Sequence, residues 1–148
     1  MARFVVAAVL VVVAVAVAFV IERRRSADAP TQPTWTVPTQ LDRAEFARPE
    51  APWLVAVFTS ATCDSCHGTI EKALVLARAD VAVDDVEVTA RKQTHERYGI
   101  DAVPTIVIAD GHGVVRASFV GPPTATDLWA AVAEARYPGS SPEPDLGH

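Results

Sequence analysis

The stretch TCDSCH, Thr62–His67, contains both cysteines of the chain. Cys63 and Cys66 are separated by two residues, which is the spacing of a dithiol that cycles between a disulfide and two thiols. Together with His67, the same letters spell C-x-x-C-H, the attachment signature of a c-type haem. Because the motif alone fits both chemistries, the surrounding elements have to decide between them.

The segments on either side of the cysteines have the patterns of a strand and a helix. Trp53–Thr59, WLVAVFT, is a continuous apolar run of strand length and is typical of a buried central strand. Beyond the cysteines, apolar residues recur at steps of three and four, at Ile70, Ala73, Leu74 and Ala77. This period predicts an amphipathic helix that begins at the dithiol.

Helical and strand patterns also occur before and after this unit. The sequence predicts a short helix at Leu41–Phe46, a strand at Val81–Val88 and a polar surface helix that Gly99 ends. Two charged pairs in this region are interpreted as ordinary solvated surface: Asp84–Asp85 and Arg91–Lys92.

The last third of the domain predicts a hairpin and a helix. The turn Asp110–Gly113 contains two glycines and separates two apolar runs, so it predicts an antiparallel hairpin with strands at 105–109 and 114–120. A final helix is expected to begin near Thr126 and to bury Leu128, Trp129, Val132 and Ala133. Strand, helix, strand, helix, hairpin and helix in this order predict an α/β fold with a mixed sheet.

This order of motifs resembles the thioredoxin family. The segments that carry the resemblance are VAVFTSAT before C-x-x-C at a helix start, RYGIDAVPT, a hairpin with a Gly turn, and VGPPTATDLWAAV. They cover about Leu41–Tyr137. The resemblance implies a thioredoxin-like fold, a mixed central sheet flanked by helices, and a thiol–disulfide oxidoreductase that acts on protein dithiols or disulfides. It also implies an unidentified electron donor or acceptor, and no cofactor.

The resemblance implies roles for single residues as well. Cys63 matches the exposed nucleophile of the family, and Cys66 matches the buried resolving thiol. Pro104 matches the cis-proline beside the dithiol, and the backbone of Val103 would pair with an extended substrate segment. The helix start favours a thiolate at Cys63 independently, because unpaired N–H groups and the positive end of the helix dipole lie there.

Three departures from the family pattern lie close to the dithiol. Thr62 stands where a tryptophan is usual, and Asp64 and Ser65 replace Gly-Pro between the cysteines. Val57 stands where the family has a buried aspartate that assists proton transfer from the resolving thiol. Asp64 opposes a neighbouring thiolate, so these residues are expected to modulate the reaction. The departures favour one alternative, a non-catalytic redox sensor or binding module of the same fold.

The haem and metal interpretations lack further ligands. A c-type haem needs a second axial ligand, but Met1 is the single methionine. The histidines besides His67 fall in a polar helix, a turn and the tail, at His95, His112 and His148. A zinc site would need a second ligand pair with suitable spacing. We therefore expect a redox dithiol, and neither haem nor metal.

The amino-terminal segment predicts a membrane anchor. Every residue of Phe4–Ile21 is Ala, Val, Leu, Ile or Phe, and as a helix the run would reach about 27 Å, close to the thickness of a bilayer core. The alternative is a signal peptide cleaved near Ala27–Ala29. Arg23–Arg25 outweigh Arg3 in the flanks, which favours a cytoplasmic side for the domain.

Composition sets the organisation and excludes one class of partner. Residues 1–25 are predicted as the anchor with its basic flank, 26–40 as a Pro-rich tether, 41–137 as the domain and 138–148 as a disordered tail. The net charge of -5 argues against nucleic acid as a partner, because a phosphate-binding surface needs a basic excess. The predicted partners are proteins and, through Phe4–Ile21, the membrane.

Overall fold

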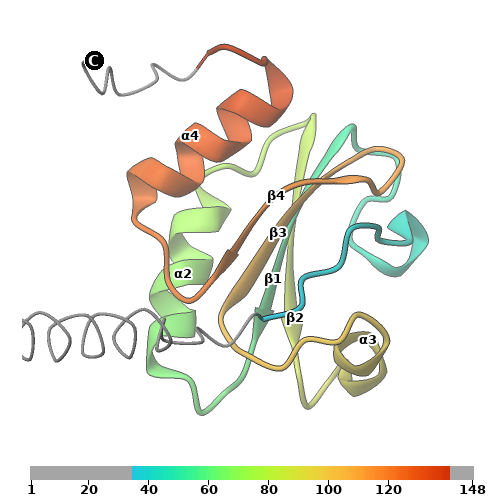
Figure 1. The fold of residues 1–148 in the computed structure, drawn as a ribbon, viewed down its shortest axis with the longest axis vertical. Coiled ribbons are helices and arrows are strands. Elements are labelled where there is room, and N and C mark those ends of the chain that lie inside the picture. Colours follow the sequence, from blue (N-terminus) through green and yellow to red (C-terminus); the bar gives the residue numbers. More distant parts are fainter. Residues whose placement is uncertain (1–34, 141–148) are drawn as a thin grey trace, which may run out of the picture. The chain divides into compact units, whose positions relative to one another are not determined.

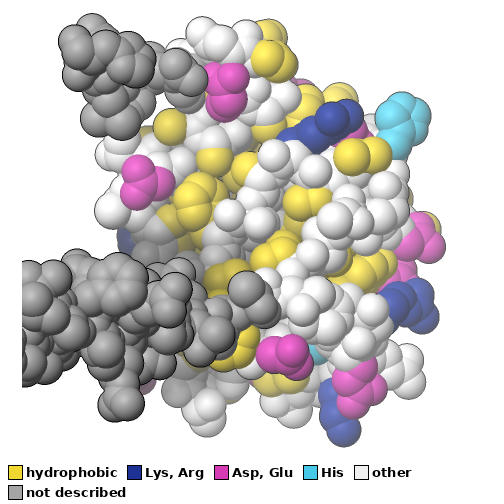
Figure 2. Space-filling view, viewed as in Figure 1, with side chains coloured by type: hydrophobic (Ala, Val, Ile, Leu, Met, Phe, Trp, Pro, Cys, Tyr) yellow, Lys and Arg dark blue, Asp and Glu magenta, His cyan; other side chains and the backbone are white. Residues whose placement is uncertain are grey.

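The computed structural model describes residues 35–140. The predicted anchor, most of the tether and most of the tail therefore lie outside the described residues. Between residues 35 and 140, no helix is long and apolar enough to cross a membrane. On the face seen in Figure 2, basic side chains are scattered among acidic and hydrophobic ones.

Four strands form one mixed sheet in the order β2-β1-β3-β4 (Figure 1). β1 (Trp53–Thr59) pairs in parallel with β2 (Val81–Glu87) and antiparallel with β3 (Thr105–Asp110). β3 also pairs antiparallel with β4 (Val115–Val120) across the predicted hairpin. β1 is thus a central strand, and it is buried along nearly its whole length, as its continuous apolar run predicts. The predicted mixed α/β sheet is confirmed.

Three helices cover the two faces of the sheet. α2 (Asp64–Leu74) and α4 (Ala125–Arg136) lie on one face, and α3 (Lys92–Arg97) lies on the other (Figure 1). The predicted helix at Leu41–Phe46 is shorter than expected, a single 3-10 turn, η1 (Arg43–Glu45). α2 begins directly after β1, so the cysteines lie where the central strand meets its first helix.

Each face of the sheet packs against its own hydrophobic core. Successive β1 side chains point to opposite faces, because a strand alternates with a period of two. Val55 and Val57 belong to the core under α2 and α4, whereas Leu54, Ala56 and Phe58 belong to the core on the α3 side. The odd-numbered residues of β1 therefore face the helix that carries the dithiol.

Some apolar side chains predicted as buried are exposed, and Ala77, which lies beyond the end of α2, is one of them. Leu74 is 55% exposed, because α2 turns a different side inward, formed by Cys66, Thr69 and Ala73, and Trp129 on α4 is 42% exposed. The indole N–H of Trp129 donates a hydrogen bond to the carbonyl of Lys72 at 3.1 Å, which holds the ring across the two helices at the surface. The apolar spacing predicted the helix correctly, but it did not predict which side of the helix faces the core.

Polar side chains on the α3 side are less solvated than the sequence predicts. His95, in the predicted surface helix, is 4% exposed, with Nε2 2.7 Å from the carbonyl of Val86 and its ring against Phe58. Asp84 and Arg91, predicted as solvated surface, form an ion pair of 2.8 Å with both side chains mostly buried. These polar groups hold α3 and the η1 segment to the sheet.

The ends of two helices follow recognisable local chemistry. The N-cap of α4 is Thr124, two residues before the predicted Thr126. The Thr124 hydroxyl accepts a hydrogen bond from the N–H of Asp127 at 3.1 Å. Gly99 follows α3 with a φ of 62°, a left-handed conformation that suits glycine. The predicted stop of α3 at this glycine agrees with the structure.

Candidate active site

The two cysteines are joined in a disulfide at the amino-terminal end of α2. Cys63 is the N-cap residue and Cys66 lies in the first turn, with their Cα atoms 5.4 Å apart. Cys66 is 3% exposed and packs toward the sheet, whereas Cys63 is half-buried at the rim. The two sulfurs thus differ in their access to a partner protein.

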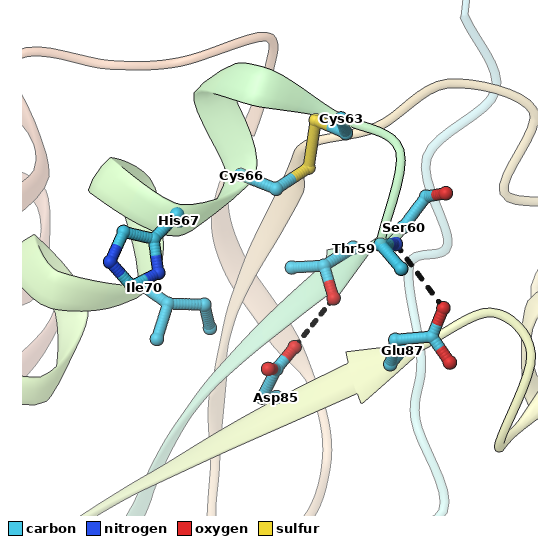
Figure 3. Close-up of a pocket in the computed structure, with 9 residues that line it drawn as sticks. Thr59, Ser60, Cys63, Cys66, His67, Ile70, Asp85 and Glu87 are labelled. Atoms are coloured by element: carbon cyan, nitrogen blue, oxygen red, sulfur yellow. Dashed lines mark hydrogen bonds between the residues drawn. A yellow bond between two sulfur atoms is a disulfide. The ribbon is translucent and has the colours of Figure 1, made fainter.

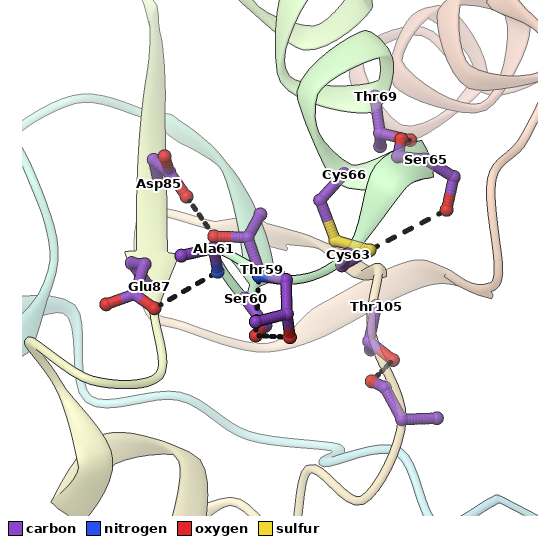
Figure 4. Close-up of a disulfide and its surroundings, with 12 residues drawn as sticks. Thr59, Ser60, Ala61, Cys63, Ser65, Cys66, Thr69, Asp85, Glu87 and Thr105 are labelled. Atoms are coloured by element: carbon purple, nitrogen blue, oxygen red, sulfur yellow. Dashed lines mark hydrogen bonds between the residues drawn. A yellow bond between two sulfur atoms is a disulfide. The ribbon is translucent and has the colours of Figure 1, made fainter.

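The start of α2 leaves hydrogen-bond donors open beside Cys63. Its backbone is extended, with φ −96° and ψ 106°, and its side chain makes no capping hydrogen bond. Among residues 35–140, the N–H groups of Asp64 and Ser65 have no hydrogen-bond partner. The Ser65 hydroxyl lies 3.7 Å from Cys63 Sγ (Figure 4). After reduction, these donors and the helix dipole would stabilise a thiolate at Cys63.

Val103 and Pro104, which are predicted to bind substrate, immediately precede β3. The Val103–Pro104 peptide bond is cis, and Pro104 is buried with its carbonyl accepting from the N–H of Gly121 at 2.8 Å. Figure 4 shows Thr105, the next residue, on the strand that passes Cys63. Within the described part of the chain, no hydrogen bond engages the backbone of Val103. Its N–H and C=O are therefore open to an extended peptide.

The residues predicted to modulate the dithiol lie around Cys63 at the surface. Thr62 and Asp64 are exposed, and the hydroxyl of Thr62 lies 3.1 Å from that of Ser60. In residues 35–140, the Asp64 carboxylate takes part in no hydrogen bond or ion pair. Its negative charge thus faces solvent in the first turn of α2 and is not neutralised by a neighbouring cation.

A cavity of about 230 Å³ opens beside the disulfide (Figure 3). It is lined by Thr59, Ser60, Ala61, Cys63, Cys66, His67, Ile70, Asp85 and Glu87. Thr59, Asp85 and Glu87 were missed as site residues by the sequence interpretation. The available signal was the period of two at the end of β2, which puts Asp85 and Glu87 on one face. Knowing which face required the pairing of β2 with β1.

Glu87, at the end of β2, binds the loop that precedes the cysteines. Hydrogen bonds from the backbone N–H groups of Ala90 and then Thr89 hold the pKa of the Glu87 carboxyl below its usual range. The same side chain accepts from the N–H of Ala61 at 3.4 Å. Glu87 therefore stays ionised at neutral pH and ties the end of β2 to the loop that leads into Cys63.

His67 completes the C-x-x-C-H motif, and the structure places it on the exposed side of α2. Between residues 35 and 140, no group of three or more His, Cys, Asp and Glu side chains is placed to hold a metal ion. The His67 side chain is 85% exposed, and its Nε2 lies 3.4 Å from the carboxylate of Glu71, one turn along α2. His67 is thus a solvated helix residue beside a disulfide.

The comparison with protein families decides the interpretation of this site. The family model named Thioredoxin matches residues 39–134, more than half of the chain. The chain belongs to the thioredoxin family. The resemblance found in the sequence is confirmed, and the fold is thioredoxin-like. A comparison with curated protein sequences found no match.

Solved thioredoxins have the same fold at low sequence identity. A mutant thioredoxin from Halobacterium salinarum is 19% identical, with a TM-score of 0.55, over 67% of this chain and 88% of its own. The germline-specific thioredoxin Deadhead from Drosophila melanogaster is 24% identical, with a TM-score of 0.52, over 58% and 83%. Fasciola hepatica thioredoxin is 23% identical, with a TM-score of 0.51, over 57% and 82%.

Family membership and the Cys63–Cys66 pair together define the chemistry. A thioredoxin domain with cysteines at C-x-x-C spacing is a thiol–disulfide oxidoreductase, and its substrates are protein disulfides. The predicted function is confirmed at this level. The roles of the two thiols, the substrate-binding segment, the redox partner and the membrane are taken up next as proposals.

Proposed function

We propose that this thioredoxin-family protein exchanges disulfides with protein substrates from a membrane anchor, with Cys63 as the nucleophile and Cys66 as the resolving thiol. The observation that carries the proposal is the difference between the two sulfurs. Cys63 lies at the rim with open N–H groups beside it, whereas Cys66 is 3% exposed. A partner protein can approach Cys63, and Cys66 can reach only a disulfide already formed there.

The reductive direction proceeds in two exchanges. The Cys63 thiolate attacks one sulfur of a substrate disulfide, forms a mixed disulfide and releases the other substrate sulfur as a thiolate. Cys66, after losing its proton, attacks Cys63 Sγ and releases the second substrate sulfur. Two electrons pass from the dithiol to the substrate, and the Cys63–Cys66 disulfide is formed. A separate electron donor then restores the dithiol, and in the oxidative direction an electron acceptor takes its place.

Substrate orientation in this proposal comes from Val103. The N–H and C=O groups of Val103 have no hydrogen-bond partner within residues 35–140, and they would form strand-like hydrogen bonds with the substrate backbone. Backbone pairing selects for extended conformation rather than for sequence, so the substrate is a locally extended segment that contains a disulfide. The exposed Asp64 adds a negative charge at the same rim.

A trapping experiment tests the roles of the thiols. In Cys66→Ser the second exchange is impossible, so the reaction should stop at the mixed disulfide and reducible, higher-mass adducts should accumulate on non-reducing gels. Cys63→Ser should trap far less, and the variant with both substitutions controls for non-covalent adducts. Equal trapping by both single variants would contradict the roles. Absence of trapping together with absence of insulin reduction would favour the sensor or binding module.

Membrane attachment is the remaining part of the proposal. It is supported by the apolar run Phe4–Ile21 and by Arg23–Arg25, which favour a cytoplasmic domain. The full chain should resist extraction from membranes by alkaline carbonate, whereas the chain without residues 1–25 should be released. A carboxyl-terminal reporter that is active on one side of the membrane tests the orientation. Release of the full chain by carbonate would contradict the anchor.

A further inference from the structure

The resolving step requires a proton acceptor near Cys66. A thiol attacks a disulfide as the thiolate, so Cys66 has to lose its proton before the second exchange. Cys66 is buried, and Val57, on the β1 face below α2, offers no group that accepts a proton. Among residues 35–140, three ionisable side chains besides the cysteines line the cavity: His67 from α2, and Asp85 and Glu87 from β2. The lining residue that β1 contributes to the cavity is Thr59, which is not ionisable.

Two of the three candidates are engaged elsewhere. The His67 ring points away from the disulfide (Figure 3), is solvated and lies beside Glu71. The Glu87 carboxylate accepts from backbone N–H groups of Ala61 and Ala90, which favour its ionised form and make it a weak proton acceptor. Both side chains thus have structural partners that would have to be given up before they could take a proton from Cys66.

Asp85 lines the same cavity as Cys66. It is the register partner of Val57 on the neighbouring parallel strand, so its side chain faces α2. The hydroxyl of Thr59, a residue 4% exposed, donates to Asp85 Oδ1 at 2.6 Å. Thr59 lies between the disulfide and Asp85 (Figure 3). Within residues 35–140, no hydrogen bond or ion pair engages the second carboxylate oxygen of Asp85.

We propose that Asp85, positioned by Thr59, accepts the proton of Cys66 during the resolving step, through water in the open cavity. The inference rests on the proposed function. The Cys66 S–H bond breaks, a carboxyl O–H bond forms on Asp85, and the Cys66 thiolate attacks Cys63 Sγ. The substrate sulfur leaves with the electron pair of the mixed disulfide. Asp85 then returns its proton to that sulfur or to bulk water, so the site is regenerated.

Stopped-flow kinetics with dithiobis-nitrobenzoate isolate this step. The reduced full chain should release one coloured thiolate as Cys63 forms the mixed disulfide, and a second as Cys66 resolves it. The first phase depends on reagent concentration and the second does not. We expect Asp85→Asn to slow the second phase about tenfold near neutral pH and to leave the first unchanged. This is below the usual range for general base catalysis, because Asp85 is exposed and water competes with it.

The pH profile separates proton transfer from a structural effect. In Asp85→Asn the second phase should rise about tenfold per pH unit, as expected when hydroxide replaces the carboxylate, whereas the profile of the unsubstituted chain should be flatter. Asp85→Glu should recover part of the rate. Thr59→Val, which removes the hydroxyl that orients Asp85, should give an intermediate second phase.

Glu87→Gln is the matched control, since it removes a carboxylate from the same cavity. It should leave the slope of the second phase against pH unchanged. Superimposable profiles for Asp85→Asn and the unsubstituted chain, or equal changes for Asp85→Asn and Glu87→Gln, would overturn the inference and leave the proposed function intact. Failure of the unsubstituted chain to form any mixed disulfide would overturn the proposed function, and this inference with it.

Discussion

Two helices pack on the same face of the sheet and begin in different ways. α4 begins at Thr124, whose hydroxyl accepts from the N–H of Asp127 at 3.1 Å and so satisfies one of the donors that a helix start leaves open. α2 begins at Cys63, whose side chain makes no capping hydrogen bond although its backbone is extended in the same manner. The start of α4 is capped by a side chain, whereas the start of α2 is uncapped and lies beside a reactive sulfur.

The difference shows how a local loss of stability can serve reactivity. Serine, threonine, aspartate or asparagine at an N-cap contributes typically about 1 kcal/mol, and α2 forgoes this contribution. Its open N–H groups and dipole are instead available to a thiolate at Cys63. The structure thus predicts opposite responses when the two N-cap residues are replaced.

The largest effect is expected for Cys63→Ser. A serine hydroxyl at this extended N-cap position can accept from the first turn of α2, so the free energy of unfolding should rise by about 1 kcal/mol over that of the reduced, unsubstituted chain. Insulin reduction should be lost completely, because the nucleophile is gone. Urea denaturation in the presence of a reductant measures the first result, and turbidity measures the second. A chain that is destabilised by the serine would contradict the view of an uncapped helix start.

Thr124→Ala should have the opposite effect on stability, because it removes a helix cap where Cys63→Ser adds one. It removes the cap of α4 and should lower the free energy of unfolding by about 1 kcal/mol. The alkylation rate of Cys63 in the folded, reduced chain should not change, since Thr124 does not line the cavity beside the disulfide. A change in that rate would show that the two helix starts are coupled, and the comparison would then fail.

The smallest effect is expected at Asp64. Its carboxylate is exposed in the first turn of α2 and opposes a negative charge on the neighbouring Cys63. Asp64→Asn should therefore increase the alkylation rate of Cys63 at pH 6 to 7 about twofold, a modest change because solvent screens an exposed charge. Asp127→Asn, in the first turn of α4, is the matched control and should leave the rate unchanged. A slower reaction in Asp64→Asn would mean that Asp64 assists Cys63.

Local patterns predicted the elements that hold the dithiol. Trp53–Thr59 has the predicted bounds, because a strand buried on both faces is a continuous apolar run between polar segments. The helix start at Cys63 followed from the end of that strand and from the helical spacing beyond it. The cis bond before Pro104 followed from the family resemblance and not from spacing.

Features that depend on pairing between distant segments could not be predicted in this way. Asp85 is exposed, as the sequence interpretation has it, but its place opposite Val57 depends on the register of two strands joined through a helix. Trp129 was assigned to the core, but the packing of α4 on α2 leaves its indole at the surface with a hydrogen bond to Lys72. Hydrophobic periodicity gives the type of an element, and its rotation and register come from the tertiary packing.

Competitive alkylation of the reduced full chain tests most directly whether the open start of α2 makes Cys63 the reactive thiol. Iodoacetamide is added below the thiol concentration near pH 7, and peptide mass spectrometry measures the modification at each cysteine. Cys63 should react at least about tenfold faster than Cys66, because the helix start favours its thiolate and burial shields Cys66. Equal rates, or faster modification of Cys66, would contradict the account.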